Sequence, residues 1–411
     1  MRERLTYKFG GSCLDKDRDY ENAARFLLED SKSAPAPVCV VVSARKGKTN
    51  RLLKEAAELF GNNPWAQIDY VVKKGEFASA EKLSWELNKL SPGKPARVST
   101  PYEWRIMAEG ENPFDSRLIG TNVALADIRD PINYPIPAGF LIIPGYVGVH
   151  TTKTLGTSKA LVALGRGASD LIAVEIARAT ESKLKLVKSA QSVYSVSPGL
   201  VRNPKPISHM TPEQALRVLE YIRSDEQFIM AEAVRHAQRK NVPLEFCSME
   251  NPEESSRIDS LFRPNESELF RALPVKENVV LIRAVVNTNT ISGIYEKLHA
   301  KKIPFNDGGT EAINGESRLH IFAETRLADR ITSVVRPLVN TMSVTEGSLI
   351  TLIDTSLDPE GNHFMRAYKA LRGIPILHSV SSGIIMHIFV QPQDTKRAVQ
   401  ALAEEFELLE P

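Results

Sequence analysis

The sequence predicts an α/β protein in which a mostly parallel sheet, sandwiched by helices, is followed by two small βαββα units. Strands and helices alternate over the first 250 of the 411 residues, which is typical of a parallel sheet. Val38–Val42 is a continuous apolar run, as expected of a strand buried on both faces. Beyond residue 277 the order strand, helix, strand, strand, helix occurs twice.

The elements of the first 250 residues follow from short local patterns. We expect a strand at Leu5–Phe9 and, from apolar residues on one helical face, a helix over Asp19–Ser31. Thr211 and Gln214 fit a capping box, so another helix begins there. Further helices are expected at Thr49–Phe60, Ala66–Lys89 and Ser169–Thr180, and further strands at Arg97–Ser99, Ala138–Ile143, Lys159–Leu164 and Lys183–Val187.

The C-terminal part looks like a duplicated ferredoxin-like unit. Ile303-Pro304 recurs as Ile374-Pro375, and His320-Ile-Phe recurs as His387-Ile-Phe. The elements expected in the two copies are Val279–Val286, Ile291–Lys302, Ile303–Asn306, Arg318–Ala323 and Leu327–Val339, then Leu349–Ile353, Gly361–Arg372, Ile374–Val380, Ile384–Val390 and Asp394–Phe406. A polar, proline-containing stretch marks a domain boundary. The expected divisions are a domain over 1–250, a linker over 251–277, and units over 278–340 and 341–411.

The composition excludes several classes of function. The 52 basic and 50 acidic side chains give a net charge of +2, too small to indicate nucleic acid or an anionic membrane as a partner. Three distant cysteines without a CxxC pair argue against a disulfide framework and for a reducing compartment. Pro131–Thr152, the longest uncharged run, holds four prolines and is not a membrane helix. Without a signal-peptide pattern, the expected location is the cytoplasm.

The segment Lys8-Phe9-Gly10-Gly11-Ser12 lies where the first strand becomes a loop. Two consecutive glycines let backbone N–H groups approach a phosphate, and a preceding lysine can neutralise a transferring phosphoryl group. A plain glycine turn after an edge strand explains this motif equally well.

A second glycine loop, Leu164–Asp170, joins a strand to a helix. Arg166 lies between two glycines, so its guanidinium can turn to grip a carboxylate bidentately, and Ser169 can cap the next helix. Asp170 replaces the third glycine of a dinucleotide fingerprint and suits an ammonium group or a catalytic lysine. Ser169 and Asp170 could also be an ordinary N-cap pair.

Gly47-Lys48-Thr49 is not the end of a P-loop, because Val42 stands where that motif needs a glycine. Ser43 and Thr49 instead place hydroxyl groups after the second buried strand, where ligands of open α/β sheets bind. The alternative is a turn and a helix cap. No pattern of metal-ligating residues occurs, so no protein-held metal is expected.

Taken together, these motifs resemble those of the aspartate kinases, within the amino acid kinase superfamily. The resemblance rests on Lys8–Ser12, Val41–Ala44, Gly47–Asn50, Leu164–Asp170, Val193-Tyr194 and Pro198, and on a C-terminal duplication similar to tandem ACT domains. It implies the amino acid kinase fold and the transfer of a phosphoryl group from ATP to L-aspartate. The Mg²⁺ ion would be held mainly by the phosphates of ATP. It also implies an amino acid effector and a homodimer or higher homo-oligomer formed through the ACT units.

The resemblance also implies roles for individual residues. Lys8 would stabilise the transferring phosphoryl group, and Asp170 would hold the substrate ammonium or orient Lys8. Phosphate or nucleotide contacts are expected from Gly10, Gly11, Ser12, Lys188, Ser189 and Tyr194. Substrate contacts are expected from Ser43, Thr49, Glu111, Arg166 and Ser169, with Glu103 as a rival to Glu111 for the family's Gly-Glu element. Effector contacts are expected at Asn306 and Asp307, where a plain β-turn is the alternative.

The departures from the family pattern concentrate on the nucleotide side. Lys188–Ser192 stands in place of Thr-Asp-Val-Asp-Gly, Ser197–Gly199 in place of Asp-Pro-Arg, and Gln227 in place of a lysine. Lys188 can supply a replacement cation. Three alternatives therefore stay open: a regulatory pseudokinase or effector-binding subunit, a kinase of this fold for another amino acid carboxylate, and a paralogue serving a specialised pathway.

Overall fold

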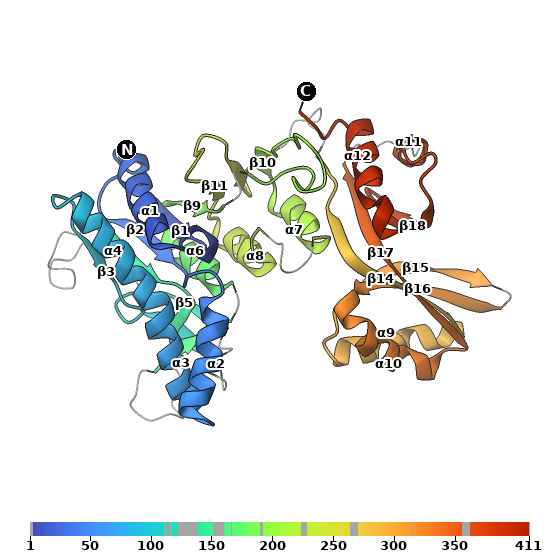
Figure 1. Cartoon of the computed structure of the whole chain (residues 1–411), viewed down its shortest axis with the longest axis horizontal. Coiled ribbons are helices and arrows are strands. Elements are labelled where there is room, and N and C mark those ends of the chain that lie inside the picture. The colour runs from blue at the N-terminus through green and yellow to red at the C-terminus, as the bar shows by residue number, and fades with distance from the viewer. Residues whose placement is uncertain are drawn as a thin grey trace. The chain divides into compact units, whose positions relative to one another are not determined.

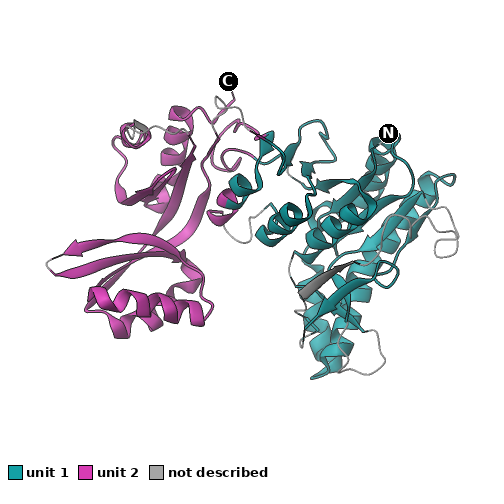
Figure 2. Ribbon diagram, turned by 180° about the vertical axis from the view of Figure 1, so that it is seen from behind, with its two compact units in different colours: residues 1–193, 208–216, 228–262 teal, residues 194–207, 217–227, 263–411 magenta. Residues whose placement is uncertain are grey.

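The chain forms two compact units, which we describe separately (Figures 1 and 2). The first contains residues 1–193, 208–216 and 228–262, and the second contains 194–207, 217–227 and 263–411. The computed structural model describes residues 3–110, 113–114, 117–121, 139–150, 160–165, 167–189, 192–222, 228–263, 270–313, 315–355 and 362–410.

The first unit is built on an eight-stranded sheet with the strand order β10-β12-β11-β9-β1-β2-β6-β3. Its strands are β1 (Leu5–Phe9), β2 (Val38–Val42), β3 (Ala96–Val98), β6 (Phe140–Pro144), β9 (Lys183–Val187), β10 (His209–Met210), β11 (Leu244–Cys247) and β12 (Ser256–Ile258). Every neighbouring pair is parallel except β11 with β12. The prediction of a mostly parallel sheet is confirmed.

Alternation along β1 decides which side chains meet which helices. The rings of Tyr7 and Phe9 both pack edge-on against Phe26 of α1 (Asp17–Asp30), 6.0 and 6.2 Å away. Thr6 points to the opposite face, where its hydroxyl lies 2.5 Å from that of Ser182, just after α6 (Ala168–Thr180). Because successive strand residues alternate between faces, Lys8 also points to the α6 side.

The other helices of this unit are α2 (Lys48–Phe60), α3 (Pro64–Val72), α4 (Ala78–Leu90) and α8 (Ala231–Lys240), with α7 (Pro212–Glu220) crossing the division between the units. The capping box at Thr211 and Gln214 is present in both directions. The helical stretch expected over Ala66–Lys89 is interrupted by a π-helical turn, Lys73–Phe77.

A small second sheet, which the sequence analysis missed, has the order β5-β4-β7-β8. Its strands are β4 (Ile106–Glu109), β5 (Arg117–Thr121), β7 (Val147–His150) and β8 (Leu161–Ala163). Only β8 lies in a predicted strand. The others are four or five residues long, too short for a period-2 pattern to distinguish them from loops.

The second unit contains both predicted copies, fused through one antiparallel sheet. The first copy is β14 (Val275–Val286), α9 (Ile291–Ala300), β15 (Asn306–Ile313), β16 (Glu316–Glu324) and α10 (Ala328–Val335). The second is β17 (Thr341–Asp354), α11 (Asn362–Ala370), β18 (Ile376–Ser382), β19 (Ile385–Val390) and α12 (Thr395–Glu405). The long β14 and β17 pair with each other, giving the order β15-β16-β14-β17-β19-β18.

Two details of this region differ from the sequence-based expectation. The strand expected at Ile303–Asn306 begins at Asn306 instead and continues to Ile313, with a register shift between Asp307 and Thr310. Residues 251–277, which we expected to form a linker, include β12 and the short strand β13 (Arg271–Ala272), and β13 pairs with β17.

Candidate active site

The predicted catalytic pair lies at the carboxyl end of β1. Lys8 is the fourth residue of β1, and Asp170 is in the first turn of α6. Lys8 Nζ is 2.6 Å from Asp170 Oδ1, as an ion pair rather than a directed hydrogen bond, and both side chains are only 5% exposed. The helix N-terminus also favours the negative charge on Asp170.

A second lysine approaches the same carboxylate. Lys188 directly follows β9, and its Nζ is 3.7 Å from Asp170 Oδ2. Burial lowers the pKa of Lys188 to about 8, opposed by Asp170 and assisted by Lys8. Burial alone would raise the pKa of Asp170, but Lys188 and Lys8 outweigh it and keep that pKa below its usual value. Asp170 is therefore ionised at neutral pH.

The glycines after β1 have different surroundings. A Cβ atom on Gly11 would lie 2.5 Å from the carbonyl oxygen of Ala44, so two loops approach each other closely at this point. A Cβ on Gly10 would have Lys8 Nζ and Ser12 Oγ as its nearest neighbours, each 3.9 Å away. Gly10 thus borders the lysine, whereas Gly11 is needed for packing.

We expect Gly11→Ala to lower the free energy of unfolding by about 1–3 kcal/mol, because the new methyl group displaces the Ala44 backbone. Gly10→Ala is the matched control, since its φ of −72° suits alanine and its Cβ has room. Its effect should be within about 0.5 kcal/mol. Urea denaturation of both variants checks this prediction, and equal destabilisation would contradict it.

Ser43 and Ser169 meet across the site, with their hydroxyl oxygens 2.9 Å apart. The capping role expected for Ser169 is wrong: Gly167 holds the N-cap position of α6 with a φ of 76°, and Ser169 lies inside the first turn. The approach of α6 depends on Gly145, where a Cβ would lie 2.5 Å from that of Ser169.

A buried glutamate that the sequence analysis missed lies beside Ser43. Glu76 is in the π-helical turn, and its Oε1 accepts a hydrogen bond from the Ala44 N–H at 3.3 Å. Its Oε2 is buried and has no hydrogen-bond partner within the described part of the chain. Burial raises the pKa of Glu76 to about 7, although the Ala44 amide and Lys48 act in the opposite direction.

Gly75-Glu76 is itself a Gly-Glu pair, the element that we sought at Gly110-Glu111 or at Glu103. Glu111 lies outside the described residues. Glu103 accepts hydrogen bonds from Arg97 at 2.7 Å and Ser99 at 2.9 Å, so its carboxylate is already engaged. The Gly75-Glu76 dipeptide could have indicated this position in the sequence. It lay, however, inside a charged segment that we expected to be an uninterrupted helix.

The remaining substrate-side residues come from two glycine turns. Arg166 lies outside the described residues, between Gly165 and Gly167, whose φ angles of 80° and 76° favour glycine. Thr49 is half-buried in the first turn of α2, which follows Gly47 with a φ of 70°. Both helices therefore begin after a left-handed glycine.

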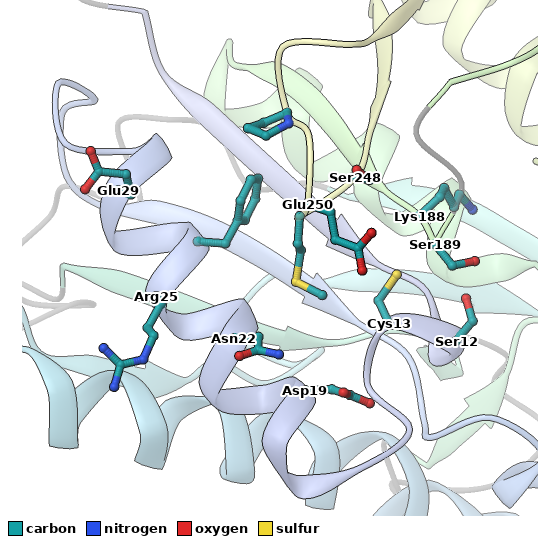
Figure 3. Close-up of a pocket in the computed structure, with 13 residues that line it drawn as sticks. Ser12, Cys13, Asp19, Asn22, Arg25, Glu29, Lys188, Ser189, Ser248 and Glu250 are labelled. Atoms are coloured by element: carbon teal, nitrogen blue, oxygen red, sulfur yellow. The ribbon is translucent and has the colours of Figure 1, made fainter.

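A pocket of about 570 Å³ adjoins the phosphate-side residues (Figure 3). Ser12 and Cys13 enter it from the loop after β1, Lys188 and Ser189 from the end of β9, and polar residues of α1 line another side. The structure brings Ser12, Lys188 and Ser189 together in this pocket. Tyr194 belongs to the second unit, where it forms an isolated β-bridge with Pro206.

The predicted effector residues open β15 in the second unit. The Asn306 side-chain oxygen accepts a hydrogen bond from Lys276 Nζ at 2.9 Å, and Asp307 accepts one from the Tyr295 hydroxyl at 2.9 Å. Asn306 and Lys276 line a small pocket of about 160 Å³, but Asp307 does not. The two residues therefore lie in different surroundings.

Within the described residues, no group of three or more histidine, cysteine, aspartate or glutamate side chains could hold a metal ion. The helices there include none of the length and apolar character needed to cross a membrane. All three cysteines are buried and free.

Residues 3–248 match the model of the amino acid kinase family. This match covers more than half of the chain, which therefore belongs to the amino acid kinase family. An aspartokinase from Pseudomonas aeruginosa is 28% identical over 243 residues. The match covers 58% of this chain, which thus spans only about half (54%) of the length of that relative. Aspartokinase 2 of Bacillus subtilis is 22% identical over 98% of each chain.

Two crystal structures of E. coli aspartokinase III have the same fold. The structure with aspartate and ADP aligns with 98% of this chain over 100% of its own length, with a TM-score of 0.71 at 17% sequence identity. The one with lysine and aspartate covers 99% and 100%, with a TM-score of 0.72 at 17% identity. The predicted fold, a kinase domain followed by paired ACT-like units, is confirmed.

Proposed function

We propose that this protein is an aspartate kinase that transfers the γ-phosphoryl group of ATP to the side-chain carboxylate of L-aspartate. The observation that carries the proposal is the buried Lys8–Asp170 ion pair between a glycine loop and the first turn of α6. Similarity to an aspartokinase over 98% of the chain supports the choice of substrate. The products would be ADP and 4-phospho-L-aspartate, an entry to the aspartate-derived amino acids.

The reaction needs positioned charges more than covalent chemistry. A carboxylate oxygen of aspartate attacks the γ-phosphorus in line, and the bond to the β–γ bridging oxygen breaks so that ADP leaves with the electron pair. Lys8 would neutralise charge on the transferring group, and Gly11 would supply a backbone N–H group, whereas the N–H of Gly10 already donates to the Val187 carbonyl at 3.5 Å. Mg²⁺ would arrive with the phosphates of ATP.

The charges of the amino acid suit the opposite side of the site. Its α-ammonium would bind Glu76, whose Oε2 has no hydrogen-bond partner among the described residues, and its α-carboxylate would bind Arg166. Asp170 already faces two lysines, so it is better suited to orienting Lys8 than to holding a third cation. Further hydroxyl contacts would come from Ser43, Thr49 and Ser169.

The second unit would bind an amino acid effector and join copies of the chain. A lysine-bound structure of E. coli aspartokinase III has the same fold, and Asn306 lines a pocket of amino-acid size. A ligand that prefers the native state raises the melting temperature, so lysine or threonine at millimolar concentration should do so. No shift with either would leave this unit as a purely structural module.

An acyl-phosphate trap tests the proposed reaction directly. We expect wild-type protein with MgATP and hydroxylamine to form a hydroxamate from L-aspartate, at a rate that depends on both substrates. A panel including glutamate and other amino acids separates the aspartate kinase from a kinase of the same fold for another acid. Hydroxamate from another amino acid but not from aspartate would contradict the proposal, as would no hydroxamate at all.

A further inference from the structure

We propose that Lys188 is a second phosphate-binding cation, which shares Asp170 with Lys8 and contacts the nucleotide donor rather than aspartate. The inference rests on the proposed use of a nucleotide. It deepens that proposal by assigning a role to a lysine that stands where the family pattern has a threonine.

The position of Lys188 follows from the sheet register. β9 pairs in parallel with β1, so that Leu186 lies opposite Lys8 and Val187 lies opposite Phe9. Lys188 is therefore one step beyond Val187 and points to the same face as Lys8. Both ammonium groups reach Asp170, one at each carboxylate oxygen.

The charges in this cluster do not balance. Two ammonium groups face one carboxylate, leaving an excess positive charge in a buried place, which is unfavourable without an anion. Lys8 holds the short contact of 2.6 Å, whereas Lys188 lies at 3.7 Å, too far for a hydrogen bond. Of the two lysines, Lys188 is therefore the one bound less closely to Asp170.

Lys188 is also within reach of a ligand. Its side chain is 19% exposed, compared with 5% for Lys8, and it lines the pocket of Figure 3 together with Ser12 and Ser189. A phosphate chain in this pocket would meet the hydroxyl groups of Ser12 and Ser189 and this ammonium group. Such contacts with a phosphate are charge-assisted hydrogen bonds.

The pH dependence supplies a test that a structural role would not mimic. Burial lowers the pKa of Lys188 to about 8, so the free protein loses this charge as the pH rises through 8. The lysine must be protonated to bind phosphate, so nucleotide affinity should fall between pH 7 and pH 9. Lys8, Asp170 and Cys13 are the titratable groups that influence this pKa besides burial.

Calorimetric titration of the full-length protein with MgADP tests the inference. Lys188→Met should weaken binding about 10–100-fold at pH 7 and reduce the pH dependence, while Lys188→Arg should restore much of the affinity. Lys240→Met, on the exposed side of α8, is the matched control and should leave binding unchanged. Melting curves establish that each variant is folded.

Unchanged MgADP affinity in a folded Lys188→Met variant would overturn the inference. The hydroxamate assay keeps this outcome distinct from failure of the proposed function. If wild-type protein makes aspartyl hydroxamate but binding ignores Lys188, only the inference fails. If binding depends on Lys188 but no hydroxamate forms, the inference holds and the proposed acceptor is wrong.

Discussion

Replacing Lys8 by methionine is expected to lower kcat/KM for hydroxamate formation at least about 100-fold. Removing one preorganised group that stabilises developing charge costs about 10²–10³ in rate. Lys8 lies 2.6 Å from Asp170, is only 5% exposed and borders the glycine loop, so no flexible surface lysine can replace it. Methionine keeps the length and apolar stem of the side chain while removing its charge.

The fold should survive this substitution, because Lys188 remains as a partner for Asp170. Lys73→Met, at an exposed ion pair on the same unit, is the control and should retain wild-type activity. Steady-state assays at pH 7 combined with melting curves check the prediction. A folded Lys8→Met variant within tenfold of wild type would contradict the assigned role.

Replacing Glu76 by glutamine is expected to affect substrate binding and stability in opposite directions. The lost carboxylate would no longer bind the α-ammonium, so KM for aspartate should rise about 10–100-fold while MgADP affinity changes little. Glu76 is buried in the π-helical turn, and its Oε2 has no hydrogen-bond partner among the described residues, so this oxygen is free to accept from the ammonium. Glu55→Gln, at a more exposed position on α2, is the control.

The stability effect has a defined sign. Burial raises the pKa of Glu76 from 4.5 to about 7, so the folded protein binds more protons than the unfolded chain between these values. Wild-type stability should therefore fall by about 3 kcal/mol as the pH rises from 4.5 to 7. Glu76→Gln lacks this loss, so its melting temperature should gain on that of wild type between pH 5 and pH 8. A constant difference would contradict a buried, titrating Glu76.

Much of the fold was predictable from the sequence because its signals are local. The apolar run Val38–Val42 became β2, and the capping box at Thr211 starts α7 as expected. What the sequence could not supply was long-range pairing. The fusion of both C-terminal copies through β14 and β17 depends on contacts between strands that are far apart in the chain.

The site shows the same division. Lys8 and Asp170 were predictable because each is fixed by a short glycine motif beside a strand or helix end. Glu76 was not, because it reaches Ala44 only through a π-helical turn that helical periodicity does not signal. The approach of Lys188 to Asp170 likewise depends on the register of β9 against β1.

A crystal structure with L-aspartate and a non-hydrolysable ATP analogue is the most direct measurement of whether one site serves both ligands. Lys8 Nζ is predicted to lie within about 3 Å of a γ-phosphate oxygen, with the α-ammonium of aspartate at a similar distance from Glu76. Aspartate bound away from Glu76, or a γ-phosphate that Lys8 does not contact, would contradict the assignment.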